Sequence, residues 1–277
     1  MKLIKPSFEI LEQEVGLEGM YKQIEKVGRT CYKSEDKIAE GTAKPFVDRM
    51  IASKHLAMVE HGTLYFKIPA NIDVAGNFLD EVPTWTKCRL VESKEGNWWA
   101  ITTNFRVMIE HFAPEYIEEL IEKYLCEPTE HHAKRVTVKF TCDRGVSHEF
   151  VRHRVFSFAQ ESTRYCNYSK DKFGNEITYI ETCWEMQPDE KELFLLQLEQ
   201  AQNAYNALIS SGWTPQQARA ILPNSLKTEL IMTGFVDDWE HFLSLRARGT
   251  TGAPHPQAKE LAEPLLTEFI KRDLLKL

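Results

Sequence analysis

The sequence predicts an α/β (α+β) fold, a single interwoven domain over residues 1–277 with a mixed sheet and long helices. Three observations predict it. Helix-type and strand-type segments alternate along the chain, with no internal repeat and no low-complexity segment. Hydrophobic residues make up 43% and charged residues 27%, which is enough for a sizeable core. No linker-like stretch marks a domain boundary, so we expect one domain.

The first third of the chain is predicted to hold two helices and a strand. The apolar spacing favours helices over 17–28 and 44–53, and Pro45 suits the first turn of the second. Residues 63–68 (TLYFKI) are rich in β-forming side chains, and Pro69 ends that run. A strand is therefore expected immediately before the middle of the chain.

The middle section, residues about 70–134, has its own pattern of elements. Residues 98–102 are predicted to form a strand. Asn104 is a suitable N-cap for a helix through Phe112, and Pro114 can open another helix through Leu125. His131 and His132 lie in a polar loop, and we expect both side chains to be solvated.

The C-terminal half is predicted to be rich in helices. Its two expected strands cover residues 136–140 and 225–233. Its five expected helices cover residues 143–152, 188–210, 214–222, 237–248, and from Pro254 or Pro256 to the C-terminus. Gly212 is a typical stop for the longest of them.

Charge and cysteine content exclude several classes of protein. The net charge is −7, whereas a protein that binds nucleic acid in general usually carries a basic excess. No run of about 18 apolar residues predicts a membrane span, and the N-terminus lacks the apolar core of a signal peptide. The six cysteines are scattered without a C-x-x-C pair. We therefore expect reduced thiols and a cytoplasmic location.

The densest polar chemistry lies at residues 152–165, which read RHRVFSFAQESTRY. Arginine suits phosphate because its planar fork donates paired hydrogen bonds and stays charged. The same run also fits a solvated helix face laced with ion pairs. Val155, Phe156 and Phe158 argue for burial instead, and only Glu161 offers a nearby acidic partner. An anion site is the favoured interpretation.

This segment resembles the signature of flavin-dependent thymidylate synthases, R-H-R-x-x-S-x-N-x-x-S-x-R-Y. Ala159 stands where the family commonly has Asn, and Gln160 stands where it often has Glu. The resemblance extends over residues about 20–68 and 142–265. The matching positions of the signature are Arg152, His153, Arg154, Ser157, Ser162, Arg164 and Tyr165.

The resemblance implies two sets of binding residues. The residues that it places at FAD are His55, Ala57, Glu60, Arg152, His153, Arg154, Gln160, Phe235, His241 and His255. The residues that it places at dUMP are Glu149, Phe150, Val151, Arg152, Gln160, Glu161, Ser162, Thr163, Arg164, Arg219 and Arg246. It also gives Arg246 the catalytic role, through contact with the uracil.

Three of these residues have an alternative interpretation. His55 and Glu60 do not have the H-E-x-x-H spacing of zinc proteases, so no metal site is expected, and a lone histidine is more often structural. Arg219 lies in a small apolar segment and needs an anionic or carbonyl partner, which a protein carboxylate also provides.

Arg246 falls on an apolar helix stripe. It shares the i, i+3, i+4, i+7 spacing with Trp239, Phe242 and Leu243, so its charge needs a neutralising partner. A structural ion pair or a side chain that reaches solvent fits this position as well. The family counterpart is an arginine at the end of an F-L-x-L-R run.

The resemblance implies that the chain methylates dUMP to dTMP with FAD, using 5,10-methylenetetrahydrofolate as carbon donor and NADPH as reductant. It further implies a homotetramer with sites at subunit interfaces, and a probable insertion at about 70–134. One alternative is another flavoenzyme acting on a uracil-containing nucleotide or on RNA uracil. A second is a non-enzymatic RNA-binding protein. Ser162 is not expected to be a covalent nucleophile, because no activating base accompanies it.

Overall fold

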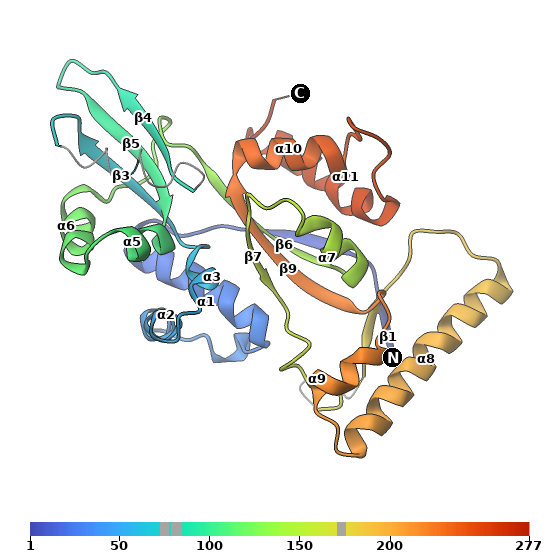
Figure 1. Cartoon of the computed structure of the whole chain (residues 1–277). Coiled ribbons are helices and arrows are strands. Elements are labelled where there is room, and N and C mark those ends of the chain that lie inside the picture. The colour runs from blue at the N-terminus through green and yellow to red at the C-terminus, as the bar shows by residue number, and fades with distance from the viewer. Residues whose placement is uncertain (73–77, 79–84, 171–175, 277) are drawn as a thin grey trace.

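The computed structural model describes residues 1–72, 78, 85–170 and 176–276 (Figure 1). Its α-helices are α1 (Gly16–Tyr32), α2 (Ala43–Ala52), α3 (Leu56–Val59), α5 (Phe105–His111), α6 (Pro114–Tyr124), α7 (Arg144–Phe150), α8 (Pro188–Ser210), α9 (Pro215–Ala218), α10 (Val236–Arg246) and α11 (Pro256–Lys271). Its strands are β1 (Lys2–Ile4), β2 (Ser7–Leu11), β3 (Thr63–Pro69), β4 (Lys87–Val91), β5 (Trp98–Asn104), β6 (Arg135–Asp143), β7 (Ser157–Gln160), β8 (Thr178–Ile180) and β9 (Lys227–Phe235). Two short 3₁₀ helices are η1 (Glu35–Lys37) and η3 (Arg219–Ile221).

The central sheet has the order β2-β6-β9-β7, and all its pairings are antiparallel. Alternate side chains of β6 and β9 point to opposite faces, as the strand period of two requires. One face carries Val138, Phe140 and Met232 into a core shared with α7, α10 and α11. Ile231 points to the other face, against α1. Figure 1 shows α10 and α11 on one side of the sheet and α1 on the other.

A second antiparallel sheet, with the order β3-β5-β4, stands beside the central one. Helices α5 and α6 pack against it in a separate apolar core. Thr63 is paired with Asn104, so the first residue of β3 meets the last residue of β5. Most of this layer is built from the middle section, and its identity as an insertion stays a prediction. Residues 73–77 and 79–84 of that section lie outside the described residues.

The N-terminal strand closes a third layer. Strand β1 pairs in parallel with β8, which comes much later in the chain. Tyr179, Leu198 and Tyr205 form the core between β8 and the long helix α8. The parallel pairing and the antiparallel sheets together confirm the predicted α+β class, and the pairing of distant segments makes the fold interwoven.

The predicted helices are confirmed, with shifts at their ends. The helix expected from residue 214 becomes a 3₁₀ turn at Arg219, and the last helix ends at Lys271 rather than at the C-terminus. The four predicted strands are confirmed; three are extended, and the one expected over 225–233 is shifted to Lys227–Phe235. Strands β1, β2, β4, β7 and β8 were not predicted, because each has only three to five residues.

Asp143 joins two helices at the end of β6. Its Oδ1 accepts a hydrogen bond of 2.7 Å from the Val146 backbone N–H, which caps α7. Its Oδ2 accepts one of 3.0 Å from Nε2 of Gln257 in α11. The side chain is buried, so both bonds replace water that the carboxylate has lost.

We predict that Asp143→Ala lowers the free energy of unfolding by about 1–2 kcal/mol, because α7 loses its cap. Asp143→Asn keeps an oxygen for the Val146 N–H and loses less. Urea unfolding followed by circular dichroism measures both. Equal stability of the wild type and the alanine variant contradicts the capping role.

Candidate functional site

Arg246 at the end of α10 connects that helix to the end of α7. Its Nη1 lies 2.6 Å from Oε2 of Glu149, and its Nη2 donates to the Glu149 carbonyl oxygen at 2.9 Å. Its Nε donates to Nε2 of His153 at 3.1 Å. The Arg246 side chain is only 15% exposed. The expected partner for a cation on an apolar stripe is therefore Glu149, 97 residues away in the sequence.

His153 is held neutral by its surroundings. Burial, followed by the charges of Arg246 and of nearby His241 and Arg152, lowers the pKa of His153 to about 4. Its ring packs edge-on against Phe242, with centroids 4.9 Å apart. Since Nε2 accepts from Arg246, the proton of the neutral ring lies on Nδ1. The histidine of the Arg-His-Arg run thus orients Arg246 and keeps one N–H donor.

Arg152 and Arg154 lie in the turn between α7 and β7, and both are exposed. Within the described part of the chain, neither side chain makes an ion pair. Phe156 anchors the turn, because it is buried against Trp239 with ring centroids 4.6 Å apart. Val155, expected to be buried, is 40% exposed. The turn therefore presents two free guanidinium groups from a fixed base.

Strand β7 carries Ala159 and Gln160 into the molecule. Ala159 is buried beside Ile231, in the core under α1, where a larger polar side chain would lack room. Nε2 of Gln160 donates to Oγ of Ser147 at 2.9 Å and to Oγ1 of Thr228 at 3.2 Å. Gln160 thus points between α7 and β9. Both departures from the family pattern, Ala159 and Gln160, are compatible with the packing.

A buried network of charges supports the segment after β7. Glu161 is 3% exposed and accepts from Nζ of Lys227 at 2.8 Å. Glu229 lies 2.5 Å from Nζ of Lys33 and 2.9 Å from that of Lys227. Burial alone would raise the pKa of the Glu229 carboxyl group, but the charges of the two lysines outweigh it and lower that pKa to about 2. The Glu161 side chain therefore supports this segment from within, and its predicted contact with dUMP stays a prediction.

Arg164 and Arg219 meet at the far end of the same segment. Nη1 of Arg219 donates to Oγ1 of Thr163 at 3.0 Å, and Nε of Arg164 donates to Oε1 of Gln216 at 2.8 Å. Both arginines are exposed. In the described part of the chain the partner of Arg219 is a hydroxyl, with no ion pair to a protein carboxylate, so its binding to an anionic ligand stays a prediction. Ser162 lies beside them, its N–H bonded to the Cys31 carbonyl at 3.0 Å.

His55 is tied to the end of the signature through a residue that sequence reasoning missed. Nδ1 of His55 lies 3.1 Å from the hydroxyl of Tyr32, and the Tyr32 ring lies 5.6 Å from that of Tyr165. Ala57 is exposed on α3, two residues further on. The His55 segment and the arginine-rich segment are therefore neighbours in space.

The other predicted flavin residues are spread over the molecule. His241 lies near His153, with ring centroids 6.3 Å apart, and so belongs to the Arg246 group. Phe235 is buried at the start of α10. His255 is exposed and packs against Trp184 at 5.6 Å. Glu60 pairs with Arg106 of α5 at 2.5 Å.

The predicted residues form two groups within one chain. Glu149, Arg152–Arg154 and Arg246 lie before β7, with Phe150 buried beneath them and Val151 partly buried. Residues 161–164 lie after β7, together with Arg219. A strand of four residues spans roughly 13 Å. Figure 1 shows α9 and α10 at opposite ends of β9, in agreement with this separation.

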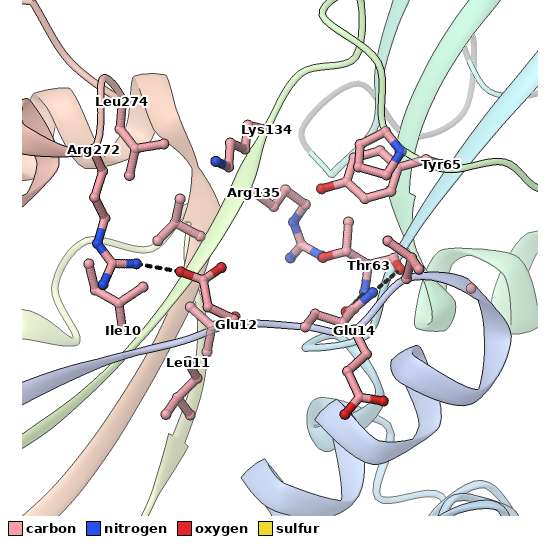
Figure 2. A pocket seen from close by; sticks show the side chains of 16 residues that line it. Ile10, Leu11, Glu12, Glu14, Thr63, Tyr65, Lys134, Arg135, Arg272 and Leu274 are labelled. Atoms are coloured by element: carbon pink, nitrogen blue, oxygen red, sulfur yellow. Dashed lines mark hydrogen bonds and ion pairs between the residues drawn. The ribbon is translucent and has the colours of Figure 1, made fainter.

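A cavity of about 470 Å³ lies apart from both groups (Figure 2). It is bounded by β2, β3, β6 and the C-terminal tail, and Glu12 pairs with Arg272 across it. Figure 2 shows Arg135 reaching from β6 toward Thr63, and its Nη1 donates to Oγ1 of Thr63 at 3.1 Å. None of the predicted site residues lines this cavity.

His132 corrects one expectation. It is only 8% exposed, and its Nε2 lies 3.0 Å from the Phe66 carbonyl oxygen. The residue is therefore a packed support of β3 rather than a solvated loop histidine. His131 remains partly exposed beside Glu130. No sequence signal distinguishes the two, because the partner of His132 is the backbone of a strand 66 residues earlier.

The site is thus a set of arginines that several elements of an α+β scaffold contribute. Residues 88–273, more than half of the chain, match the family described as thymidylate synthase complementing protein. The chain belongs to this family. Among the described residues, no helix is long and apolar enough to cross a membrane.

Curated relatives resemble part of the chain. The flavin-dependent thymidylate synthase of Geobacter sulfurreducens is 32% identical over 103 residues, which cover 37% of this chain and 43% of that protein. The one of Corynebacterium diphtheriae is 29% identical over 147 residues, covering 48% and 56%. The chain thus spans about half the length of these relatives. A crystal structure of the UMP/dUMP methylase PolB from Streptomyces cacaoi bound with 5-Br dUMP has 17% identity and a TM-score of 0.46, covering 98% of this chain and 93% of that one.

We predict that neutral His153 makes stability depend on pH. Its folded pKa of about 4 lies below the ordinary 6.5, so the unfolded chain binds the proton more readily. The free energy of unfolding should therefore fall as the pH drops from 6.5 toward 4. His153→Gln should make this fall shallower, and urea unfolding at several pH values measures it.

The control is His131→Gln, in an exposed loop, which should keep the slope of the wild type. Buried His61, whose pKa burial lowers to about 3, contributes in the same range, so the slope of His153→Gln should not vanish. Identical slopes for His153→Gln and the wild type contradict the prediction.

Proposed function

We propose that this chain is an FAD-dependent enzyme that methylates dUMP to dTMP, with 5,10-methylenetetrahydrofolate as carbon donor and NADPH as reductant. The observation that carries the proposal is the bonding of Arg246 to both His153 and Glu149. It joins the Arg-His-Arg run to the arginine that the resemblance places at the uracil. The family match and the names of the curated relatives support the same chemistry.

The residues present fit the ligands that the proposal requires. Arg152 and Arg154 are exposed and form no ion pair in the described part of the chain, so they can bind phosphate groups of a nucleotide or of FAD. His153 is neutral and can donate from Nδ1 to a flavin or uracil carbonyl. The aromatic packing of Phe242 and Phe150 beneath it supplies a dry floor.

Arg246 has the donors that its proposed role needs. Three of its N–H groups bond to Glu149 and His153, and a guanidinium has five. The two that remain can donate to a uracil oxygen and stabilise negative charge on the ring, which makes its C5 more nucleophilic. When bound, FAD supplies the hydride and the folate supplies the carbon. The role of the protein is to hold the uracil and to stabilise its charge.

We propose that the second group binds the dUMP phosphate, and that the site is completed between chains of a homotetramer. Arg219, Arg164 and Ser162 lie together at the surface, beyond the far end of β7 from Arg246. A nucleotide bound to Arg246 of one chain can therefore meet this group from another chain. All six cysteines are free thiols, which agrees with a cytoplasmic enzyme.

The experiment that tests the function is the visible spectrum of the purified protein, followed by substrate comparison. We expect a flavin spectrum that changes on addition of dUMP, and dTMP formation when folate and NADPH are present. UMP and uracil-containing RNA should give little product. A flavin spectrum without response to dUMP contradicts the proposal, and faster reaction with RNA uracil favours the alternative flavoenzyme.

We predict that Arg246→Ala lowers dTMP formation at least about a hundredfold, because the charge on the uracil loses its stabilising donor. Circular dichroism should show a folded protein. Arg246→Lys keeps the charge without the planar fork and should retain part of the rate. Arg89→Ala, in an exposed position of β4, is the control for loss of an arginine. Turnover by Arg246→Ala within a few-fold of the wild type refutes this role.

A further inference from the structure

The middle section holds the Glu60 carboxylate in place. Nη1 of Arg106, in α5, lies 2.5 Å from Oε1 of Glu60, and its Nη2 lies 2.9 Å from Oε1 of Glu110 one turn further along α5. Nε of Arg106 is buried and has no partner among the described residues. The Glu60 side chain is 19% exposed. Arg106 is thus fixed by its own helix and turned toward Glu60.

The backbone beside Glu60 is held by α5 and by the first residue of β6. The Phe105 N–H donates to the Gly62 carbonyl at 2.9 Å, and Nη2 of Arg135 donates to the Glu60 carbonyl at 3.2 Å. Gly62 packs closely on α1, since a Cβ there would lie 2.6 Å from the Ile24 side chain. Both the main chain and the carboxylate of Glu60 therefore depend on residues from 104 onward.

We propose that Arg106 is a positioning residue that orients the Glu60 carboxylate for FAD and offsets part of its charge. This rests on the proposed function and on the resemblance, which places Glu60 at FAD. Within the described part of the chain, Oε1 of Glu60 is taken by Arg106 and Oε2 has no partner, so Oε2 is available to an N–H or O–H of the ligand. Without Arg106, a free carboxylate would repel the negatively charged pyrophosphate of FAD. The middle section thereby takes part in cofactor binding from outside the arginine-rich segment.

The test is the FAD dissociation constant of the full chain, measured by flavin fluorescence. Arg106→Gln should weaken FAD binding roughly tenfold, the loss expected for one charge-assisted hydrogen bond. Arg106→Lys keeps a charge beside Glu60 and should restore most of the affinity. The effect of Arg106→Gln should be largest at low salt, because it includes an unscreened repulsion.

A double-mutant cycle separates this role from a structural one. In a Glu60→Gln background, Arg106→Gln should weaken FAD binding much less than it does alone, because the carboxylate to be oriented is gone. Lys123→Gln is the matched control, since Lys123 forms an exposed i, i+4 pair with Glu119 on α6. It should leave the dissociation constant unchanged.

Three results would overturn the inference. The first is an unchanged FAD dissociation constant in Arg106→Gln. This result counts even if the variant has a lower melting temperature, because Arg106 would then serve stability alone. The second is an equal loss with and without the Glu60 carboxylate. The third is a wild-type chain that binds no FAD, which also refutes the proposed function; the first two leave that function standing. If Arg106→Gln does not fold, Arg106→Lys and its salt dependence decide the question.

Discussion

A cation placed between two helices organises the centre of this molecule. Arg246 lies on the face of α10 that carries Trp239 and Phe242 into the core, so most of its side chain is out of water. A buried charge is tolerated only with a partner and with its hydrogen bonds satisfied. Glu149 supplies both a carboxylate and a carbonyl, and His153 supplies a neutral nitrogen. The end of α7 and the turn after it are thereby fixed against α10.

The same logic of buried charge appears at the base of the middle section. Arg135 is buried, its hydrogen-bond partners among the described residues are neutral oxygens, and burial lowers its pKa to about 10. Arg135 is the first residue of β6, where the chain returns from the second sheet to the central sheet. It faces Thr63, the first residue of β3, where the chain enters the second sheet. The Arg135 guanidinium therefore joins the two points at which the chain passes between the sheets. Helix α5 lies beside Glu60 at the same place. The second sheet and its helices are therefore part of the scaffold around a predicted cofactor residue.

Local signals predicted much of the fold, while long-range contacts were beyond them. Asn104 and Asp143 both cap the helices that their positions favour, because a cap depends on neighbours three residues away. Strand β7 was missed, since its short SFAQ run has no alternating pattern, and only pairing with β9 makes it a strand. The polar loop around His132 predicts a solvated side chain, whereas its contact with the distant Phe66 carbonyl keeps it buried.

The site shows the same division. The spacing of residues 152–165 predicted which residues matter, and the apolar stripe predicted that Arg246 needs a partner. Neither could predict that the partner is Glu149, because that pairing depends on how α7 and α10 pack. Tyr32, which links His55 to Tyr165, carried no signal at all, since an aromatic residue near a helix end is ordinary.

The separation of the two arginine groups constrains any mechanism for this chain. Arg246 and His153 are turned toward one end of β7, whereas Arg219 and Thr163 meet beyond the other end. Rigid strand pairing with β9 prevents the strand from shortening, so the two groups cannot approach within one chain. In the proposed homotetramer, one chain would hold the base of the nucleotide and another chain its phosphate. Binding and assembly would then be linked, because a ligand that bridges two chains stabilises the assembly that it binds.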